Sequence, residues 1–264
     1  MLGLDVRFLP DAAPQGAGAA DVAVADVAVV IDVLRMTTTA AVLLERGMAS
    51  LTVVAGVDAA RAEARSVGAL LLGERGGVKL PGFDHGNSPL EFGELDLAAR
   101  RGVLCTTNGS KAVEASAAAR HLLLGAIVND AAVAARAVAL AESGITLVCA
   151  GTEGRVALED ALGAACILER VLELEPAAEL TDAARLALLA LRAAGDPEAG
   201  VRGSRHAATL AGLGFDADVA FAARRGALSL VAERVAGPPA RFELVGDGLA
   251  PRPPTGAPGS AAPR

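Results

Sequence analysis

Aromatic side chains are nearly absent from this chain of 264 residues, which has six phenylalanines, no tryptophan and no tyrosine. A core must therefore be packed from alanine, valine and leucine, and hydrophobic residues make up 53% of the sequence. Proteins that bind single-stranded nucleic acid stack bases on aromatic rings, and proteins that bind duplexes need positive charge. The formal net charge is −7, so we expect no nucleic-acid partner.

Cysteines are few, and long apolar runs are absent. Cys105, Cys149 and Cys166 show no CxxC spacing, and an odd, unpaired set is typical of a reducing compartment. A membrane-spanning helix needs roughly 18 or more apolar residues, and a signal peptide needs a basic region before an apolar core. Neither pattern occurs in the sequence, so we expect a soluble cytoplasmic protein with no membrane partner.

Several familiar catalytic motifs are missing as well. The sequence has no GxxxxGK[ST] phosphate loop, no DxDx[TV] aspartyl-phosphate motif and no HExxH zinc motif. Its three histidines are dispersed along the chain, which argues against a zinc site. Any phosphate or metal chemistry must therefore come from another arrangement of residues.

Short strand-like runs alternate with helical stretches along the chain. The expected strands are residues 4–9, 26–32, 51–55, 69–73, 102–105, 121–124, 145–149 and 228–235. The expected helices are residues 37–48, 57–67, 110–119, 130–142, 156–173 and 181–194, with shorter pieces to about residue 223. This order predicts a three-layer α/β/α sandwich with a largely parallel or mixed central sheet and a helical C-terminal part.

We expect one α/β domain over residues 1–236, and two packed lobes that divide near residue 156 are the alternative. Residues 237–264 are rich in proline, glycine and alanine, which predicts a disordered tail. Residues 10–20 are expected to form a loop. Residues 74–89 form a second, aperiodic loop, and long loops in compact domains are often functional.

Polar residues follow three of the predicted strands, at the end where ligands bind in such folds. The first segment runs from Asp32 and Arg35 to three threonines, residues 37–39, that open a helix. Helix N-termini present free N–H groups to anions, and threonine hydroxyls add further donors. The alternative is structural, with a threonine as the N-cap and Asp32 closing a turn.

The other two segments have the same character. Residues 105–111 place Asn108 and Gly109 before a helix, where they favour either an anion site or an ordinary turn. Residues 149–155 bring two glycines and Arg155, whose planar fork suits carboxylate, sulfonate or phosphate. Glu159 and Asp160 follow on a helix, either as metal ligands or as charges that favour the helix dipole.

The loop of residues 73–89 adds two carboxylates, two cations, a histidine and an asparagine. The chain has only two lysines, Lys79 and Lys111, and both lie in these polar segments. Together the segments predict a site for an anion and a metal ion. Because the candidate ligands are carboxylates, Mg²⁺ is the metal that fits them best.

The chain contains, in this order, the segments IDVLRMTTT, GERGGVKLPGFDHGNSPLEF, TTNGSKAV and CAGTEGRVALED. Together they resemble the 2-phosphosulfolactate phosphatase family, and the resemblance extends from about residue 4 to about residue 235. It implies Mg²⁺-dependent hydrolysis of 2-phospho-3-sulfolactate to 3-sulfolactate and phosphate, on the route to coenzyme M. The implied partner is a small anionic phospho-acid, and a related 2-phospho-acid is the alternative substrate.

From these segments we assign candidate roles. The catalytic candidates are Asp32, Glu74, Arg155 and His206, with His206 as a general acid that protonates the leaving oxygen. The substrate-binding candidates are Arg35, Thr37, Thr38, Arg75, Lys79, Asn87, Ser88, Thr106, Thr107, Asn108, Gly109, Lys111, Gly151 and Thr152. The candidate metal ligands are Asp32, Glu74, Asp84, Glu153, Glu159 and Asp160.

Three positions depart from the family pattern. Met36 stands where alanine is usual, Cys105 where threonine is usual, and Ala207 where glycine follows the histidine. One alternative function is therefore a non-catalytic protein that binds a phospho-acid on the same fold. A scaffold whose polar strand ends are only caps is the other. The sequence also leaves open a homo-oligomer, and attack by water versus a covalent phosphoenzyme.

Overall fold

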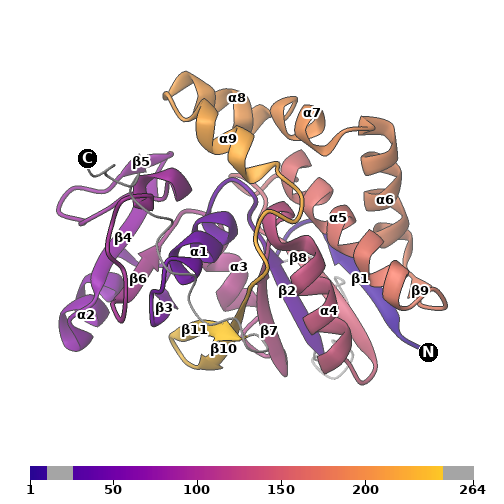
Figure 1. Cartoon of the computed structure of the whole chain (residues 1–264), viewed down its shortest axis with the longest axis horizontal. Coiled ribbons are helices and arrows are strands. Elements are labelled where there is room, and N and C mark those ends of the chain that lie inside the picture. Colours follow the sequence, from indigo (N-terminus) through magenta and orange to yellow (C-terminus); the bar gives the residue numbers. More distant parts are fainter. Residues whose placement is uncertain (11–25, 246–264) are drawn as a thin grey trace, which may run out of the picture.

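The computed structural model describes residues 1–10 and 26–245, which form an eleven-stranded sheet with helices on both faces (Figure 1). The strands, in the order in which they hydrogen bond, are β5 (Val78–Lys79), β4 (Leu70–Arg75), β6 (Arg101–Cys105), β3 (Ser50–Val53), β11 (Ala240–Val245), β10 (Val231–Ala236), β7 (His121–Gly125), β2 (Val27–Ile31), β8 (Gly144–Cys149), β1 (Gly3–Arg7) and β9 (Glu179–Leu180). The expected α/β sandwich with a mixed sheet is confirmed.

The sheet consists of two parallel blocks joined by a hairpin. Strands β4, β6 and β3 form one parallel block, and β7, β2, β8, β1 and β9 form the other. Between them lie β11 and β10, which pair antiparallel with each other and with β3 and β7. The last two strands that the structure describes therefore hold the two blocks together.

The central strand β2 shows why the sheet is covered on both faces. All five of its residues are buried, as its continuous apolar run predicts. Because side chains alternate along a strand, Val27, Val29 and Ile31 enter one apolar cluster, while Ala28 and Val30 enter another. Two separate layers of helices must cover these two faces.

The helices divide between the two faces and one end of the sheet. They are α1 (Met36–Glu45), α2 (Val57–Val67), α3 (Gly109–Ala115), α4 (Asp130–Leu140), α5 (Leu158–Leu174), α6 (Asp182–Ala194), α7 (Pro197–Arg202), α8 (Arg205–Gly212) and α9 (Asp216–Ala222), with 3-10 turns η1 (Pro89–Phe92) and η2 (Ile127–Asn129). Helices α4, α5 and α6 pack on one face of the second block, and α1 and α3 pack on the other. Helices α7, α8 and α9 lie together at one end of the molecule, at the top of Figure 1.

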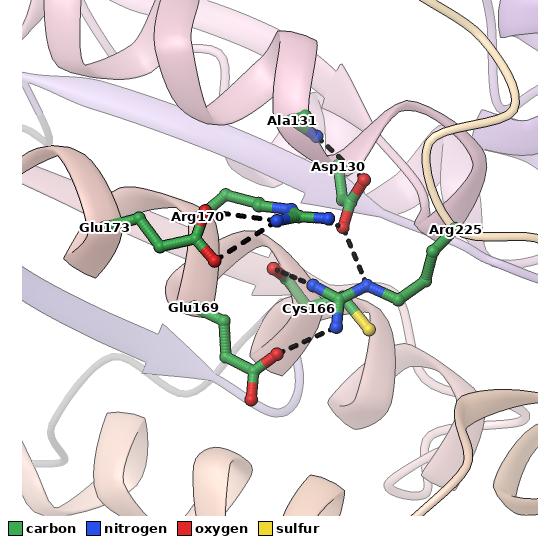
Figure 2. A network of polar contacts seen from close by, with 7 residues as sticks. All are labelled: Asp130, Ala131, Cys166, Glu169, Arg170, Glu173 and Arg225. Atoms are coloured by element: carbon green, nitrogen blue, oxygen red, sulfur yellow. Dashed lines mark hydrogen bonds and ion pairs between the residues drawn. The ribbon is translucent and has the colours of Figure 1, made fainter.

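A buried ion-pair network holds the segment that leads into the hairpin. Asp130 is 0% exposed and accepts hydrogen bonds from Arg170 Nε at 3.3 Å and Arg225 Nε at 2.9 Å. Arg225 also donates to Glu169 Oε2 and to the carbonyl of Cys166. Figure 2 shows Arg225 reaching from the segment after α9 to side chains at the start of α4 and along α5. This network secures the path of the chain toward β10.

The predicted elements agree with the structure to within four residues at each end. Four short elements, β5, β9, η1 and η2, were not predicted from the sequence. The expected tail from residue 237 is wrong for residues 240–245, which form β11. The Gly-Pro-Pro composition at 237–239 marks the turn of a hairpin and not the end of the fold. Residues 246–264 of the expected tail, and residues 11–20 of the expected first loop, lie outside the described residues.

Strands from both sides of residue 156 belong to the same sheet, since β9, β10 and β11 pair with strands from the first half of the chain. Within residues 1–10 and 26–245, no helix combines the length and the apolar character that crossing a membrane requires.

The structure predicts that the hairpin is essential to stability. Phe242 on β11 is 0% exposed and packs in the cluster under α1, so Phe242→Ala should lower the free energy of unfolding by about 3–5 kcal/mol. Replacing its half-exposed neighbour Arg241 by Ala should change it by less than about 0.5 kcal/mol. Urea denaturation measures both, and equal small effects would mean that β11 is dispensable.

Candidate active site

A cavity of about 540 Å³ lies where strands β2, β4, β6 and β8 end, facing helix α8. Its lining comes from the segments that follow these strands and from α8: Asp32, Leu34, Arg35, Glu74, Gly76, Gly77, Asn87, Thr107, Asn108, Thr152, Glu153, Arg155, Val156, Ala157, Leu158, Glu159, Gly203, Ser204, Arg205, His206, Thr209 and Leu210. The carboxyl ends of parallel strands are the usual ligand site in open α/β sheets. All four catalytic candidates, Asp32, Glu74, Arg155 and His206, line it.

The turn that carries Asp32 is built by the three threonines that follow it. The hydroxyls of Thr37 and Thr38 donate to the carbonyls of Asp32 and Val33, at 2.9 and 2.8 Å. The Thr39 hydroxyl donates to the carbonyl of Asn87 at 3.0 Å. Thr37 and Thr38, expected to bind substrate, are buried and do not belong to the described lining of the cavity. Their hydroxyls instead shape the turn that presents Asp32.

Asp160, a metal candidate, joins the ends of two neighbouring strands. Its Oδ1 accepts the N–H of Val33, after β2, at 2.9 Å, and its Oδ2 accepts the N–H of Gly151, after β8, at 3.0 Å. Burial, followed by the charges of Asp32 and Glu159, holds the pKa of Asp160 well above its usual range. Asp160 is therefore directed at the backbone, and it is not among the described residues that line the cavity.

Glu74 makes the same kind of link in the other block. One carboxylate oxygen accepts the N–H of Gly77 at 2.8 Å, and the other accepts the N–H and hydroxyl of Thr107 at 2.8 and 2.9 Å. The turn after β4 is thereby joined to the loop after β6. Glu74 lines the cavity, but both its oxygens already hold protein donors.

Asp32, Glu159 and His206 form the electrostatic centre of the cavity. His206 Nδ1 lies 3.2 Å from Glu159 Oε1 and 3.4 Å from the Thr152 hydroxyl. Burial by itself lowers the pKa of His206, but the hydrogen bond and charge of Glu159 and the charge of Asp32 outweigh it and raise that pKa. Burial raises the pKa of Asp32 to about 6, the charges of Glu74 and Glu159 add to the rise, and His206 opposes it.

Arg35 lines the cavity, but its donors reach protein partners. One guanidinium nitrogen forms a buried ion pair with Asp218 at 2.8 Å, and another donates to the carbonyl of Gly77 at 2.7 Å. The guanidinium also lies 4.1 Å from the ring centre of Phe215. Arg35, expected to bind substrate, thus ties the turn after β2 to helix α9 and to the turn after β4.

Two other arginines are placed differently. Arg155 and Arg205 are exposed, line the cavity and have no side-chain hydrogen bond or ion pair within the part of the chain that the structure describes. The expected cations Arg75, Lys79 and Lys111 are not part of the described lining. Arg75 donates to the carbonyls of Glu74 and Ala55, and Lys79 donates to that of Asp84.

The remaining candidates fall into two groups. Asn87, Thr107, Asn108, Thr152 and Glu153 line the cavity. The others contact neighbouring protein groups: the Ser88 hydroxyl donates to the Asp218 carboxylate, the hydroxyls of Thr106 and Ser110 accept each other's backbone N–H, and Asp84 accepts the N–H of Leu71.

The glycines at these strand ends are needed for close packing. A Cβ at Gly109 would lie 2.5 Å from Asp32 Oδ2, and one at Gly151, whose φ is +66°, would lie 2.6 Å from the carbonyl oxygen of Arg155. Neither glycine belongs to the described lining.

Two carboxylates of the cavity are suited to hold a metal ion. Within the described ranges no group of three or more His, Cys, Asp or Glu side chains is placed to hold a metal ion. Asp32 and Glu159 both line the cavity, and each keeps one carboxylate oxygen with no hydrogen-bond donor among the described residues. Mg²⁺ is commonly held by one or two carboxylates together with water and substrate phosphate. This pair fits such a site.

Sequence reasoning missed part of the lining. Thr209 and Leu210 lie four residues after Arg205 and His206, so one face of helix α8 brings both pairs to the cavity. That helical spacing could have identified them. Residues 156–158 line the cavity because they follow Arg155 directly. No pattern in the sequence identifies Leu34 as a residue of the cavity lining.

Comparisons with known proteins identify the family of this chain. The family model described as 2-phosphosulpholactate phosphatase matches residues 15–237. A protein of Deinococcus radiodurans named "Probable 2-phosphosulfolactate phosphatase" is 48% identical over 214 residues, which cover 80% of this chain and 89% of the relative. Proteins with the same name from Thermus thermophilus and Carboxydothermus hydrogenoformans are 42% and 38% identical, over 75% and 87% of this chain and 84% and 92% of their own length.

The Glu159–His206 contact makes a prediction about titration. Glu159→Gln removes the charge that raises the pKa of His206, so that pKa should fall, as measured by NMR titration of the ring. Because the pKa is raised in the folded protein, the contact adds stability that is fully present below the ordinary value of 6.5 and is lost as the pH rises through the raised value. The variant should lose this pH-dependent stability.

His121 on β7, outside the described lining of the cavity, provides the internal control, since the chemical shifts of its ring at one fixed pH should be the same in both proteins. An unchanged His206 curve in Glu159→Gln would contradict the assigned contact.

Proposed function

The chain belongs to the 2-phosphosulpholactate phosphatase family and is a phosphoric monoester hydrolase. From this premise we propose that it hydrolyses 2-phospho-3-sulfolactate, or a related small 2-phospho-acid, to the 2-hydroxy acid and phosphate, with Mg²⁺ and in the cytoplasm. One observation carries the proposal. A single cavity joins the buried carboxylate of Asp32, a histidine whose pKa is raised by Glu159, and two arginines that have no ion-pair partner among the described residues.

The arginines suit the proposed substrate. 2-Phospho-3-sulfolactate carries a phosphate, a carboxylate and a sulfonate, and the net charge of −7 repels it at long range. Binding therefore depends on local cations. Arg155 and Arg205 line the cavity from two different segments, and their planar donor forks match all three anionic groups.

Asp32 and Glu159 would hold Mg²⁺, which neutralises phosphate charge and lowers the pKa of bound water. Near neutral pH Asp32 is largely ionised, because its pKa is about 6, and it presents a carboxylate that can accept a proton from attacking water. Glu74 is engaged by backbone donors, so we assign it to positioning the loops after β4 and β6.

His206 protonates the leaving oxygen in this proposal. Its Nδ1 faces Glu159, which leaves Nε2 to donate a proton. The raised pKa keeps more of the ring protonated near neutrality than an ordinary histidine would be. A secondary alkoxide is a poor leaving group, so an acid at this position has a clear use.

The departures from the family pattern lie away from this chemistry. Met36, Cys105 and Ala207 are all buried and are not part of the described cavity lining. The N–H of Ala207 donates to the Ser204 hydroxyl, and the Cys105 thiol lies against Arg75 and the carbonyl of Ala55. These substitutions are therefore compatible with a working site.

Phosphate release from a panel of phospho-acids tests the function and the metal. We expect hydrolysis of 2-phospho-3-sulfolactate that EDTA abolishes and added Mg²⁺ restores. 2-Phospholactate, which lacks only the sulfonate, should give a kcat/KM lower by about 10- to 100-fold, since one charge-assisted contact is lost. Turnover that survives EDTA would contradict the metal, and an inert protein would contradict the hydrolase.

A second experiment tests His206 as the acid. An aryl phosphate has a leaving group that needs little protonation. His206→Ala should therefore lower kcat on the phospho-acid by about 10²–10⁴-fold and on the aryl phosphate by much less. His85, which pairs with Glu91 outside the described lining, provides the matched control as His85→Ala, with little loss on either substrate. Equal losses of His206→Ala on both substrates would assign the residue to binding or structure.

A further inference from the structure

One buried side chain at the wall of the cavity makes no contact that would explain its polarity. Asn87 is 4% exposed and lines the cavity. Its Oδ1 is the one buried side-chain nitrogen or oxygen, among the residues described, that lacks a hydrogen-bond partner. Its Nδ2 also donates to no protein group among the described residues, but unlike Oδ1 it is not fully buried, so Nδ2 is the atom of the amide that a ligand in the cavity can reach. Buried polar atoms without partners are rare in folded proteins, so this amide needs an explanation.

The loop around Asn87 does not need the amide for its structure. The backbone carbonyl of Asn87 accepts the Thr39 hydroxyl at 3.0 Å. On one side, the N–H of Gly86 donates to Glu91 Oε2 at 3.0 Å, and on the other the Ser88 hydroxyl donates to Asp218 Oδ1 at 2.8 Å. Because three neighbouring contacts already fix the loop, the side-chain amide is free for another use.

A second buried asparagine shows the contrast. Asn129 is 1% exposed, its Oδ1 accepts the N–H of Ala126 at 2.8 Å, and its Nδ2 donates to the carbonyl of Leu230 at 3.2 Å. This residue joins the turn just before α4 to the residue just before β10. It is not part of the described cavity lining. Asn129 has the contacts that a structural role requires, and Asn87 has none of them.

We propose that the Asn87 amide contacts the substrate by donating a hydrogen bond to a phosphoryl oxygen, an inference that rests on the proposed function. The carboxylates Asp32, Glu74 and Glu159 in the same cavity repel a phosphate, and a neutral donor offsets this without adding charge. Since Nδ2 has no hydrogen-bond acceptor among the described residues, it gives up no protein hydrogen bond when it donates to a ligand. The donor then strengthens as charge develops on the phosphoryl oxygens.

Replacing Asn87 should weaken phosphate binding without lowering the thermal stability of the protein. Inorganic phosphate, titrated calorimetrically into the full-length protein with Mg²⁺ present, should bind Asn87→Ala about 10- to 100-fold more weakly than the wild type. The melting temperature without phosphate should not fall, because no protein hydrogen bond is lost. Asn87→Asp, which keeps the size but loses both donors, should bind phosphate at least as weakly. Asn129→Ala should bind phosphate normally and melt about 4–10 °C lower.

Each outcome decides the question. Unchanged phosphate affinity in Asn87→Ala overturns the proposal, and so does a wild type that binds no phosphate. A loss of affinity together with a melting temperature as low as that of Asn129→Ala assigns the amide to the fold and also overturns it. Because the readout is phosphate binding, a wild type that binds phosphate but hydrolyses no phospho-acid would refute the proposed function and leave this inference standing.

Discussion

The site depends on buried carboxylates that accept backbone N–H groups from two strand ends at once. Asp160 links the residues that follow β2 and β8, and Glu74 links the turn after β4 to the loop after β6. A buried carboxyl group without hydrogen-bond partners is unfavourable, so each of these two groups stabilises the arrangement in which both loops supply their N–H groups to it. These hydrogen bonds fix the positions of the segments that carry Asp32, Thr107 and Thr152 relative to their neighbouring strand ends.

The hairpin of β10 and β11 joins the block that contains β4 and β6 and the block that contains β2 and β8 into one sheet. It lies between the parallel blocks, so the ends of β4 and β6 and the ends of β2 and β8 can line the same cavity. The buried ion pair of Arg35 and Asp218 then ties α9 to the turn after β2. Helix α8, which carries His206, packs against α9 and faces the strand ends as a result.

The raised pKa of Asp32 makes the stability of the protein depend on pH. The pKa of Asp32 is about 6 in the folded protein and 3.8 ordinarily, so Asp32 ionises at a higher pH in the folded protein than in the unfolded chain. Stability therefore falls as the pH rises from about 4 to about 6, by an amount on the order of 3 kcal/mol for this one group. The folded protein carries this penalty because the carboxyl group of Asp32 is buried at the cavity. The charges of Glu159 and Asp32 also raise the pKa of His206.

The sequence by itself determined the alternating α/β pattern, the polar character of the strand ends and the four residues Asp32, Glu74, Arg155 and His206 that line the cavity. Apolar runs and their spacing are local properties, and strand ends of a parallel sheet meet at one edge, so both can be read along the chain. The family segments, being contiguous, could also be read directly.

Only the tertiary structure decided how each polar group is used. Asp160 meets Val33 across 127 residues, and Arg35 meets Asp218 across 183. A carboxylate, hydroxyl or guanidinium bonds to the nearest donor or acceptor that packing provides, and no local pattern specifies that partner. For the same reason β11 could not be found from its sequence: a short strand after a Gly-Pro-Pro turn is stabilised by β3 and β10, which the chain brings together only on folding.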